Sequence, residues 1–231
     1  MAEKDPSIFT YERVRDHFDT EDAAANYPCT YTNSFRHQRE KTVLTELIQQ
    51  LSPDSHVLAL PCGTGREAIL LHETGHRTTA ADASSHMVEY TRQNTTKIAA
   101  AGRIEYAVRE AAQTGYPDKH FDAVICNRLF HHFAEPETRI EVLKEFARLT
   151  DGPIIVSFKS STSISWQIKR FSKWIRGHDI GTGRSISVST IRSELAEAGL
   201  SIDSLRPIIP GVSRMWYACG HSQASSALKA A

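Results

Sequence analysis

The residues of this chain best suited to chemistry are two glycines and one acid, each placed after a short apolar run. Gly63 and Gly65 follow the run at 57–60, and Asp82 ends a second run 19 residues after Gly63. Glycine lets the backbone turn sharply and lets a ligand approach closely, and the helix that follows presents unpaired N–H groups. An acid at the end of a second strand can accept hydrogen bonds from both hydroxyls of a ribose. This spacing predicts a nucleotide-type ligand, with helix capping as the alternative role of Asp82.

Four further side chains follow later predicted strands. Glu110 lies after the third strand, where it could accept a hydrogen bond from an adenine amine or remain a solvated loop acid. Asn127 ends the fourth strand, at the edge of the sheet where ligands of such folds bind. His131 and His132 follow it, and an imidazole can take up a proton near neutral pH. We therefore expect a general base at one of these histidines; the alternative is that they cap a turn or pack against Phe133.

The elements that must position these residues alternate along the chain. Strands are expected at 56–60, 77–81, 103–107, 121–126, 153–158, 201–208 and 214–219, and helices at 64–74, 85–100, 136–149 and 188–199. This alternation predicts a doubly wound α/β fold, in which a mainly parallel sheet is covered by helices on both faces. The Pro207–Gly211 connection is too short for a crossover helix, so the last two strands should pair antiparallel and leave one reversed strand near an edge.

Three segments in order carry a resemblance to a known family. They are Leu60-Pro61-Cys62-Gly63-Thr64-Gly65-Arg66, then Asp82-Ala83-Ser84-Ser85-His86-Met87, then Pro117-Asp118-Lys119-His120-Phe121-Asp122-Ala123-Val124. This order resembles class I S-adenosylmethionine (SAM)-dependent methyltransferases, and within them the small-molecule branch that includes the ubiquinone and menaquinone methyltransferases.

The resemblance implies a seven-stranded sheet with the cofactor SAM lying across strands one to four. Gly63 and Gly65 would pass under the methionine and ribose, Asp82 would hold the ribose hydroxyls, Glu110 and Ala111 would meet the adenine, and Asn127 would lie near the methionine end. The full set expected to bind the cofactor is Leu60, Cys62, Gly63, Thr64, Gly65, Asp82, Ala83, Met87, Glu110, Ala111 and Asn127. No metal is expected, because no carboxylate cluster accompanies the histidines at ligand spacing.

One position departs from the family pattern. The family usually has an acid on the first strand, two residues before Pro61, and this chain has Ala59. That change removes an anionic partner for the amino group of the cofactor or for nearby backbone. Cofactor binding is then weaker, or another acid takes its place.

Two additions to the sheet are expected to select the acceptor. Residues 1–52 form a helical segment whose aromatic residues either make a lid or pack on the sheet edge: Tyr11, Phe18, Tyr27, Tyr31 and Phe35. The methyltransferase domain spans 53–221 and includes a cap insert at 159–186, and 222–231 is a frayed tail. Within the insert, 164–176 has the pattern of a basic amphipathic helix, which either caps the acceptor pocket or contacts a membrane or lipid.

Composition narrows the function further. The chain has 231 residues, with 27 Lys and Arg against 27 Asp and Glu, so no overall charge attracts nucleic acid. No apolar run is long enough to span a membrane, no secretory signal is apparent, and the four cysteines form no CxxC pair. We therefore expect a cytoplasmic enzyme that methylates a small, hydrophobic or aromatic acceptor by in-line displacement; the composition gives no indication of the oligomeric state.

Two other functions are compatible with the same residues. Gly63-x-Gly65-x-x-Ala68 with an acid about twenty residues later also fits the dinucleotide fingerprint of an NAD(P)-dependent oxidoreductase. No Tyr-x-x-x-Lys pair accompanies it. The other alternative, favoured by Ala59, is a protein that binds SAM without turnover.

Overall fold

A computed structural model describes residues 19–20, 31, 33–98, 102–176 and 185–223. In chain order the elements are α3 (Phe35–Ile48), β1 (His56–Ala59), α4 (Arg66–Glu73), β2 (Arg77–Asp82), α5 (Ser85–Thr95), β3 (Ile104–Val108), β4 (Ala123–Cys126), the 3-10 turn η2 (Phe130–His132), α6 (Pro136–Leu149), β5 (Ile154–Lys159), α7 (Ile164–Ile175), α8 (Val188–Glu197), β6 (Leu200–Pro207) and β7 (Met215–Ser222).

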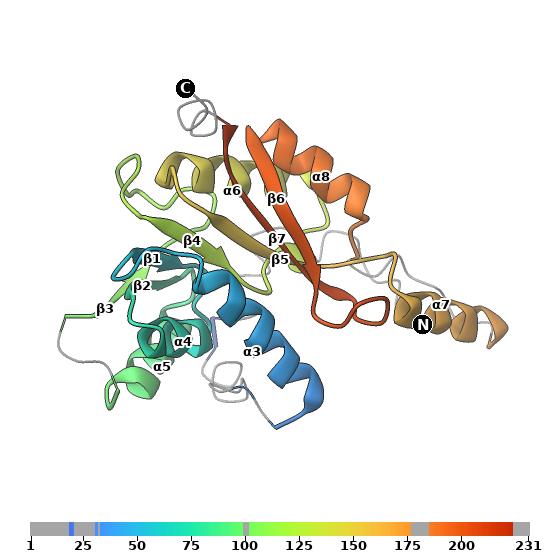
Figure 1. The fold of residues 1–231 in the computed structure, drawn as a ribbon, viewed down its shortest axis with the longest axis horizontal. Helices are drawn as coiled ribbons and strands as arrows, with labels where there is room; N and C mark the ends of the chain where they lie inside the picture. The colour runs from blue at the N-terminus through green and yellow to red at the C-terminus, as the bar shows by residue number, and fades with distance from the viewer. Residues whose placement is uncertain (1–18, 21–30, 32, 99–101, 177–184, 224–231) are drawn as a thin grey trace.

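The strands form one seven-stranded sheet in the order β3-β2-β1-β4-β5-β7-β6 (Figure 1). The pairs among β1 to β5 are parallel, whereas β7 is antiparallel to both β5 and β6. This confirms the predicted doubly wound sheet and its reversed strand near one edge. The strands β2, β1 and β4 are neighbours and run parallel, so their carboxyl ends lie at the same edge of the sheet.

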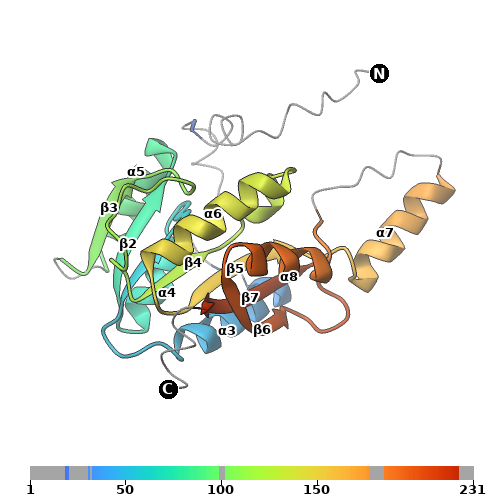
Figure 2. The same ribbon diagram turned by 90° about the horizontal axis from the view of Figure 1, so that it is seen from above.

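Alternating residues of the strands divide the core into two faces. Val57 and Ala59 of β1 pack with α3 and α4, whereas Leu58 packs with α6 and α8 on the opposite face. Figure 2 shows the sheet from above, with α6 and α3 on opposite sides of it. These buried runs explain why the strand pattern could be read from the sequence, since strands covered on both faces are almost continuously apolar.

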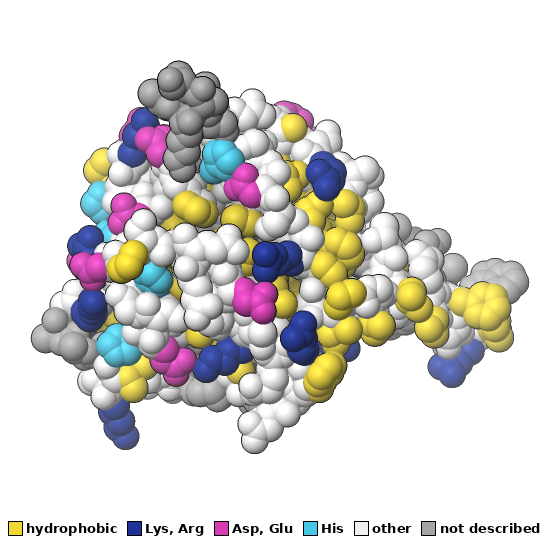
Figure 3. Space-filling model, in the orientation of Figure 1, with side chains coloured by type: hydrophobic (Ala, Val, Ile, Leu, Met, Phe, Trp, Pro, Cys, Tyr) yellow, Lys and Arg dark blue, Asp and Glu magenta, His cyan; other side chains and the backbone are white. Residues whose placement is uncertain are grey.

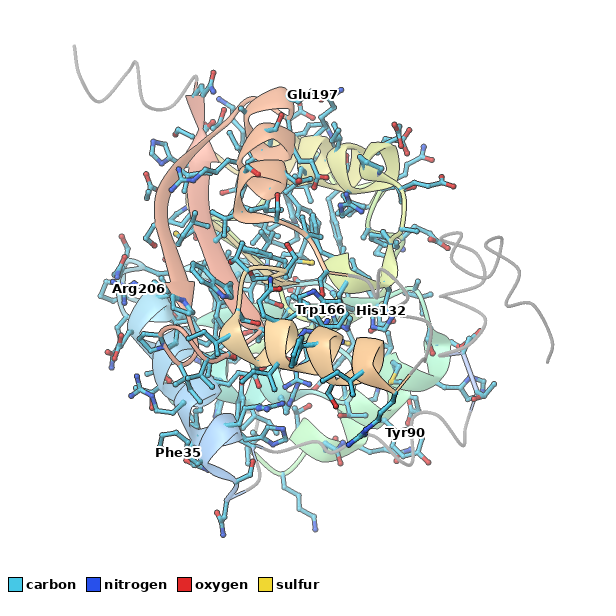
Figure 4. All side chains as sticks on the ribbon, turned by 90° about the vertical axis from the view of Figure 1, so that its right-hand side faces the viewer. Phe35, Tyr90, His132, Trp166, Glu197 and Arg206 are labelled. Atoms are coloured by element: carbon cyan, nitrogen blue, oxygen red, sulfur yellow. The ribbon has the colours of Figure 1, made fainter. Side chains whose placement is uncertain are left out.

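The N-terminal segment is described only in part. Of the predicted helical region, α3 is a helix that buries Val43, Leu44 and Leu47 against the sheet. Phe35 at its start is 70% exposed and points away from the body (Figure 4). The aromatic residues Tyr11, Phe18 and Tyr27 of the expected lid lie outside the described residues.

The helix α7 projects from the body of the molecule (Figures 1 and 2). Its third residue, Trp166 (labelled in Figure 4), is buried, and the Arg214 guanidinium lies 4.0 Å from the centre of the indole. Beyond this anchor, Ile168 and Ile175 are 63% and 64% exposed. The predicted helix is therefore present, but its apolar stripe faces away from the core.

Two smaller expectations were wrong. The helix α5 ends at Thr95, not at residue 100, and β7 ends at Ser222, not at residue 219. Pairing of Ser222 with Leu200 of β6 extends the strand beyond the apolar run, which the side-chain pattern does not reveal.

Candidate cofactor and active site

The glycine turn connects the end of β1 to the start of α4. Gly63 and Gly65 both have left-handed backbone, with φ of +53° and +103°. A Cβ on Gly63 would meet no heavy atom within 4 Å, whereas a Cβ on Gly65 would come within 3.4 Å of Thr91 on α5. Gly63 thus leaves open space above the turn, while Gly65 lets α4 begin close to α5.

Asp82 fastens this turn to the start of α5. Its two carboxylate oxygens accept hydrogen bonds from the backbone N–H of Gly63 (2.9 Å) and of Ser84 (3.0 Å). Burial raises the pKa of Asp82 to about 6, against the opposite effect of these backbone donors. The cap of α5 itself is Ser84, whose Oγ accepts from the Met87 N–H at 3.1 Å.

An open cavity of about 840 Å³, including solvent-filled space, lies over these strand ends. Its lining residues come from the turn, from the loops after β2, β3 and β4, and from α4 and α5: Leu60, Pro61, Cys62, Gly63, Thr64, Arg66, Glu67, Asp82, Ala83, Ser84, Met87, Ala111, Asn127, Arg128, Leu129, His132 and Phe133.

The cavity brings together most of the residues expected from the sequence. Nine of the eleven expected cofactor residues line it; Gly65 and Glu110 do not. Glu110 forms an isolated bridge with Gln113. Of the two histidines, His132 lines the cavity and His131 does not. His131 is buried, and its ring centre lies 4.2 Å from that of His132. The binding roles of all these residues, Gly65, Glu110 and His131 included, stay predictions.

One end of the cavity holds charged side chains that sequence reasoning missed. Glu67, the second residue of α4, accepts a hydrogen bond from Asn127 Nδ2 at 2.7 Å. Arg66 lies beside it, with the guanidinium 3.8 Å from the Glu67 carboxylate. Arg128 also lines the cavity and pairs with Glu40 of α3, which is fully buried.

The pKa shifts of this charged group follow from burial and pairing. Burial pushes the pKa of Glu40 up, but the Arg128 guanidinium more than offsets it and leaves the pKa below its usual value. For Arg66, burial acts in the direction that lowers the pKa. The Glu67 carboxylate outweighs that effect, so the pKa of Arg66 is raised overall. Both arginines therefore stay charged at the cavity.

Comparison with known proteins agrees with this geometry. Residues 57–151 match the model of a family described as "Methyltransferase domain". They include β1 from Val57 onward, β2 to β4, the glycine turn and Asp82. Over these residues the chain is similar to a methyltransferase domain.

Solved structures share the fold of this chain. Magnesium protoporphyrin IX methyltransferase from Synechocystis PCC 6803 with bound SAH has a TM-score of 0.73 at 21% identity, covering 93% of this chain and 100% of that one. A methyltransferase described as SAM-dependent from Aquifex aeolicus has a TM-score of 0.60 at 16% identity, covering 92% and 98%. The [4+2]-cyclase SpnF has a TM-score of 0.68 at 16% identity, covering 92% and 97%. No curated protein sequence matches this chain.

The residues of the cavity fit SAM as the cofactor. Gly63 leaves room where the ligand must approach the backbone, and Asp82 presents a carboxylate at the end of β2. At the end of β4, Asn127, Glu67 and Arg66 offer groups of both charges, as the ammonium and carboxylate of a methionine require. No group of His, Cys, Asp and Glu in the described part of the chain could hold a metal ion.

The missed residues differ in how readily the sequence could have shown them. Arg66 and Glu67 directly follow the glycine turn, so their place in the first turn of α4 puts them near any ligand there. Glu40 and Arg128 are 88 residues apart, and no spacing rule joins them. Only the packing of α3 against the sheet brings the Glu40 carboxylate to the loop after β4.

Proposed function

We propose that this methyltransferase transfers the methyl group of SAM to a small hydrophobic or aromatic acceptor. The observation that carries this proposal is that one cavity joins the cofactor motifs to Leu129, Phe133 and His132, which follow β4. SAM supplies an activated methyl group when it is bound. The side chains of the chain then have to align the acceptor in line with that group and exclude water.

We propose His132 as the general base for an acceptor that must lose a proton. Its ring lines the cavity beside Phe133, so it can reach an acceptor bound among apolar side chains. His131 is the weaker candidate, because it is 5% exposed and does not line the cavity. The expected result is that His132→Gln lowers turnover with little effect on SAM affinity, while His131→Gln affects stability more than turnover.

The N-terminal segment is proposed to cover the cofactor. Asp19 supports this, because its Oδ1 accepts from Ser84 Oγ at 2.9 Å and lies 3.0 Å from His86 Nδ1. Ser84 lines the cavity next to Asp82. A segment anchored there would lie over the ribose end of the cofactor, as a lid that excludes water does.

The apolar stripe of α7 is proposed to contact an anionic membrane or lipid surface. Ile164, Ile168 and Ile175 are each more than half exposed, and apolar side chains follow the projecting helix in Figure 3. Residues 159–184 contain six basic residues and one acidic residue. None of the α7 side chains that the structure describes lines the cavity, which favours a surface role over a pocket cap. Flotation with phosphatidylglycerol vesicles, but not with phosphatidylcholine vesicles, is the expected result, and Ile168→Ser should weaken it.

The location and the acceptor branch are proposals as well. Among the described residues, no helix has the length and apolar character to cross a bilayer. The described cysteines, Cys62, Cys126 and Cys219, are free and buried, which suits the reducing cytoplasm we propose. Quinone-like and aromatic hydroxyl compounds are the acceptors to test first.

Calorimetry with SAM, SAH and NAD tests the cofactor assignment. We expect heat with SAM and SAH and none with NAD; the reverse would indicate an oxidoreductase. Conversion of SAM to SAH in the presence of acceptors then separates an enzyme from a binding protein. That step is needed because the fold also occurs in the [4+2]-cyclase SpnF.

A further inference from the structure

The first strand brings no charged group to the cavity. Ala59 ends β1, is fully buried and packs in the apolar cluster between the sheet, α3 and α4. The acid that the family usually has at this position is therefore not replaced by a neighbour on the same strand. If the cofactor ammonium has an anionic partner, another element must supply it.

Glu67 is a carboxylate placed for that role. It is 4% exposed, yet it lines the cavity. Within the described residues, both of its recorded polar contacts, with Asn127 Nδ2 at 2.7 Å and with Arg66 at 3.8 Å, involve Oε1. A buried carboxylate requires pairing of its lone pairs. Its second oxygen, Oε2, has none in these contacts and is left for a ligand.

The position of Glu67 matches the amino-acid end of the cofactor. Glu67 is bonded to Asn127 at the end of β4, whereas Asp82 ends β2, and β1 separates these strands. Strands lie nearly 5 Å apart, so the two carboxylates belong to positions roughly 10 Å apart along the sheet edge. If Asp82 meets the ribose, Glu67 lies where the methionine should be.

The other buried acid nearby cannot take this role. Glu40 does not line the cavity, and both of its oxygens accept from the Arg128 guanidinium. Its charge is therefore already compensated within the protein.

We infer that Glu67 replaces the missing strand acid and accepts a hydrogen bond from the α-ammonium of the methionine moiety of SAM. This inference rests on the proposed use of SAM at this cavity. It assigns to the first turn of α4 an anionic role that the resemblance places on the first strand.

Two ligands that differ at the amino-acid end test the inference by calorimetry. SAH has the ammonium and carboxylate, whereas 5′-methylthioadenosine has the same nucleoside and a thioether but no amino acid. Glu67→Gln keeps the size and the acceptor for Asn127 while removing the charge. We expect this variant to bind SAH about tenfold or more weakly, and to bind 5′-methylthioadenosine within about twofold of the parent protein.

Controls separate the possible results. Glu73→Gln, on the same helix but exposed and paired with Lys41, should leave the binding of both ligands unchanged. Unchanged SAH affinity in Glu67→Gln, or an equal loss for both ligands, would overturn the role of Glu67 in ammonium recognition. If the parent protein binds neither ligand, the proposed function itself fails.

Discussion

Glu40 and Arg128 join α3 to the loop after β4 through a bidentate ion pair. Arg128 Nε donates to Glu40 Oε1 at 2.9 Å, and a terminal guanidinium nitrogen donates to Oε2 at 2.5 Å. Arg128 has a left-handed backbone with φ of +62°, and its N–H donates to Ser157 Oγ at 2.7 Å. Strained backbone of this kind persists where surrounding contacts determine it. The ion pair with Glu40 therefore holds the Arg128 side chain, which lines the cavity, in place.

Removing either partner of this pair should have unequal effects. Arg128→Met leaves the fully buried Glu40 carboxylate without its cation and should destabilise the protein by about 3 kcal/mol. Glu40→Gln should cost roughly 1–2 kcal/mol, because Arg128 is 26% exposed and keeps some hydration. Urea unfolding of both variants and of the double variant measures the coupling. Strict additivity would contradict a direct interaction.

The same pair predicts opposite pH dependences. In the parent protein the pKa of Glu40 is lowered, so its contribution to stability is present above the ordinary pKa of a glutamate and is lost as pH falls through the lowered value. In Arg128→Met, burial is opposed only by the Arg66 charge and the hydrogen bond from Asn127, so the pKa of Glu40 should rise. The destabilisation by this substitution should therefore shrink as the pH is lowered below the raised pKa, and unfolding curves across pH would detect it.

Asp82 should make the ligand-free protein less stable at neutral than at acidic pH. Its pKa is raised from 3.8 to about 6, so its contribution is fully present below the unfolded value and is lost as pH rises through about 6. The loss amounts to about 3 kcal/mol at most. Asp82→Asn removes this titration, so the variant should gain stability relative to the parent protein between about pH 4 and pH 7.

Cofactor binding should respond to Asp82 in the opposite sense. The ionised carboxylate is the better acceptor for ribose hydroxyls, so SAM affinity should fall as pH decreases below about 6. Asp82→Asn should bind SAM weakly at every pH. Titration calorimetry at several pH values checks this, and pH-independent affinity in the parent protein would assign Asp82 a structural role only.

Gly63 should be required for binding more than for folding. A Cβ at Gly63 would project into open space over the turn, where the cofactor is expected to pass. Gly63→Val should therefore abolish SAM binding, while a left-handed side chain costs about 1–2 kcal/mol of stability. Gly199→Ala has the same kind of backbone, with φ of +76° and open space around it, but lies after α8 and should leave binding unchanged. Normal SAM binding by Gly63→Val would remove the site assignment.

The sheet and its order of elements could be predicted because the signals are local. Buried parallel strands are short apolar runs, and Pro207–Gly211 is too short to cross the sheet, so β6 and β7 had to pair antiparallel. The glycine turn and Asp82 could be placed at one edge for the same reason. The topology then brings their loops to a single cavity without further information.

The charged end of the cavity could not be predicted in the same way. The Glu40–Arg128 pair depends on how α3 docks on the sheet, and the spacing of its residues gives no sign of it. Asn127 was expected because it ends a strand, but its partner Glu67 comes from a helix 60 residues earlier. Long-range polar contacts of this kind follow from packing, which a periodic pattern does not encode.

Gly152 shows the same limit for the backbone, and it yields a test of packing. Its place after α6 favours a left-handed helix cap, yet it is not among the glycines with positive φ. A Cβ there would instead lie 1.9 Å from the carbonyl oxygen of Asp122, whose N–H donates to His56 O at 2.9 Å. Gly152→Ala must therefore displace the start of β4 from β1 and should destabilise the protein by about 3 kcal/mol. Gly75→Ala, in left-handed backbone with open space around it, should cost about 1 kcal/mol. Urea unfolding of both variants decides the matter, since equal losses would mean that Gly152 is needed for its backbone conformation and not for this close approach.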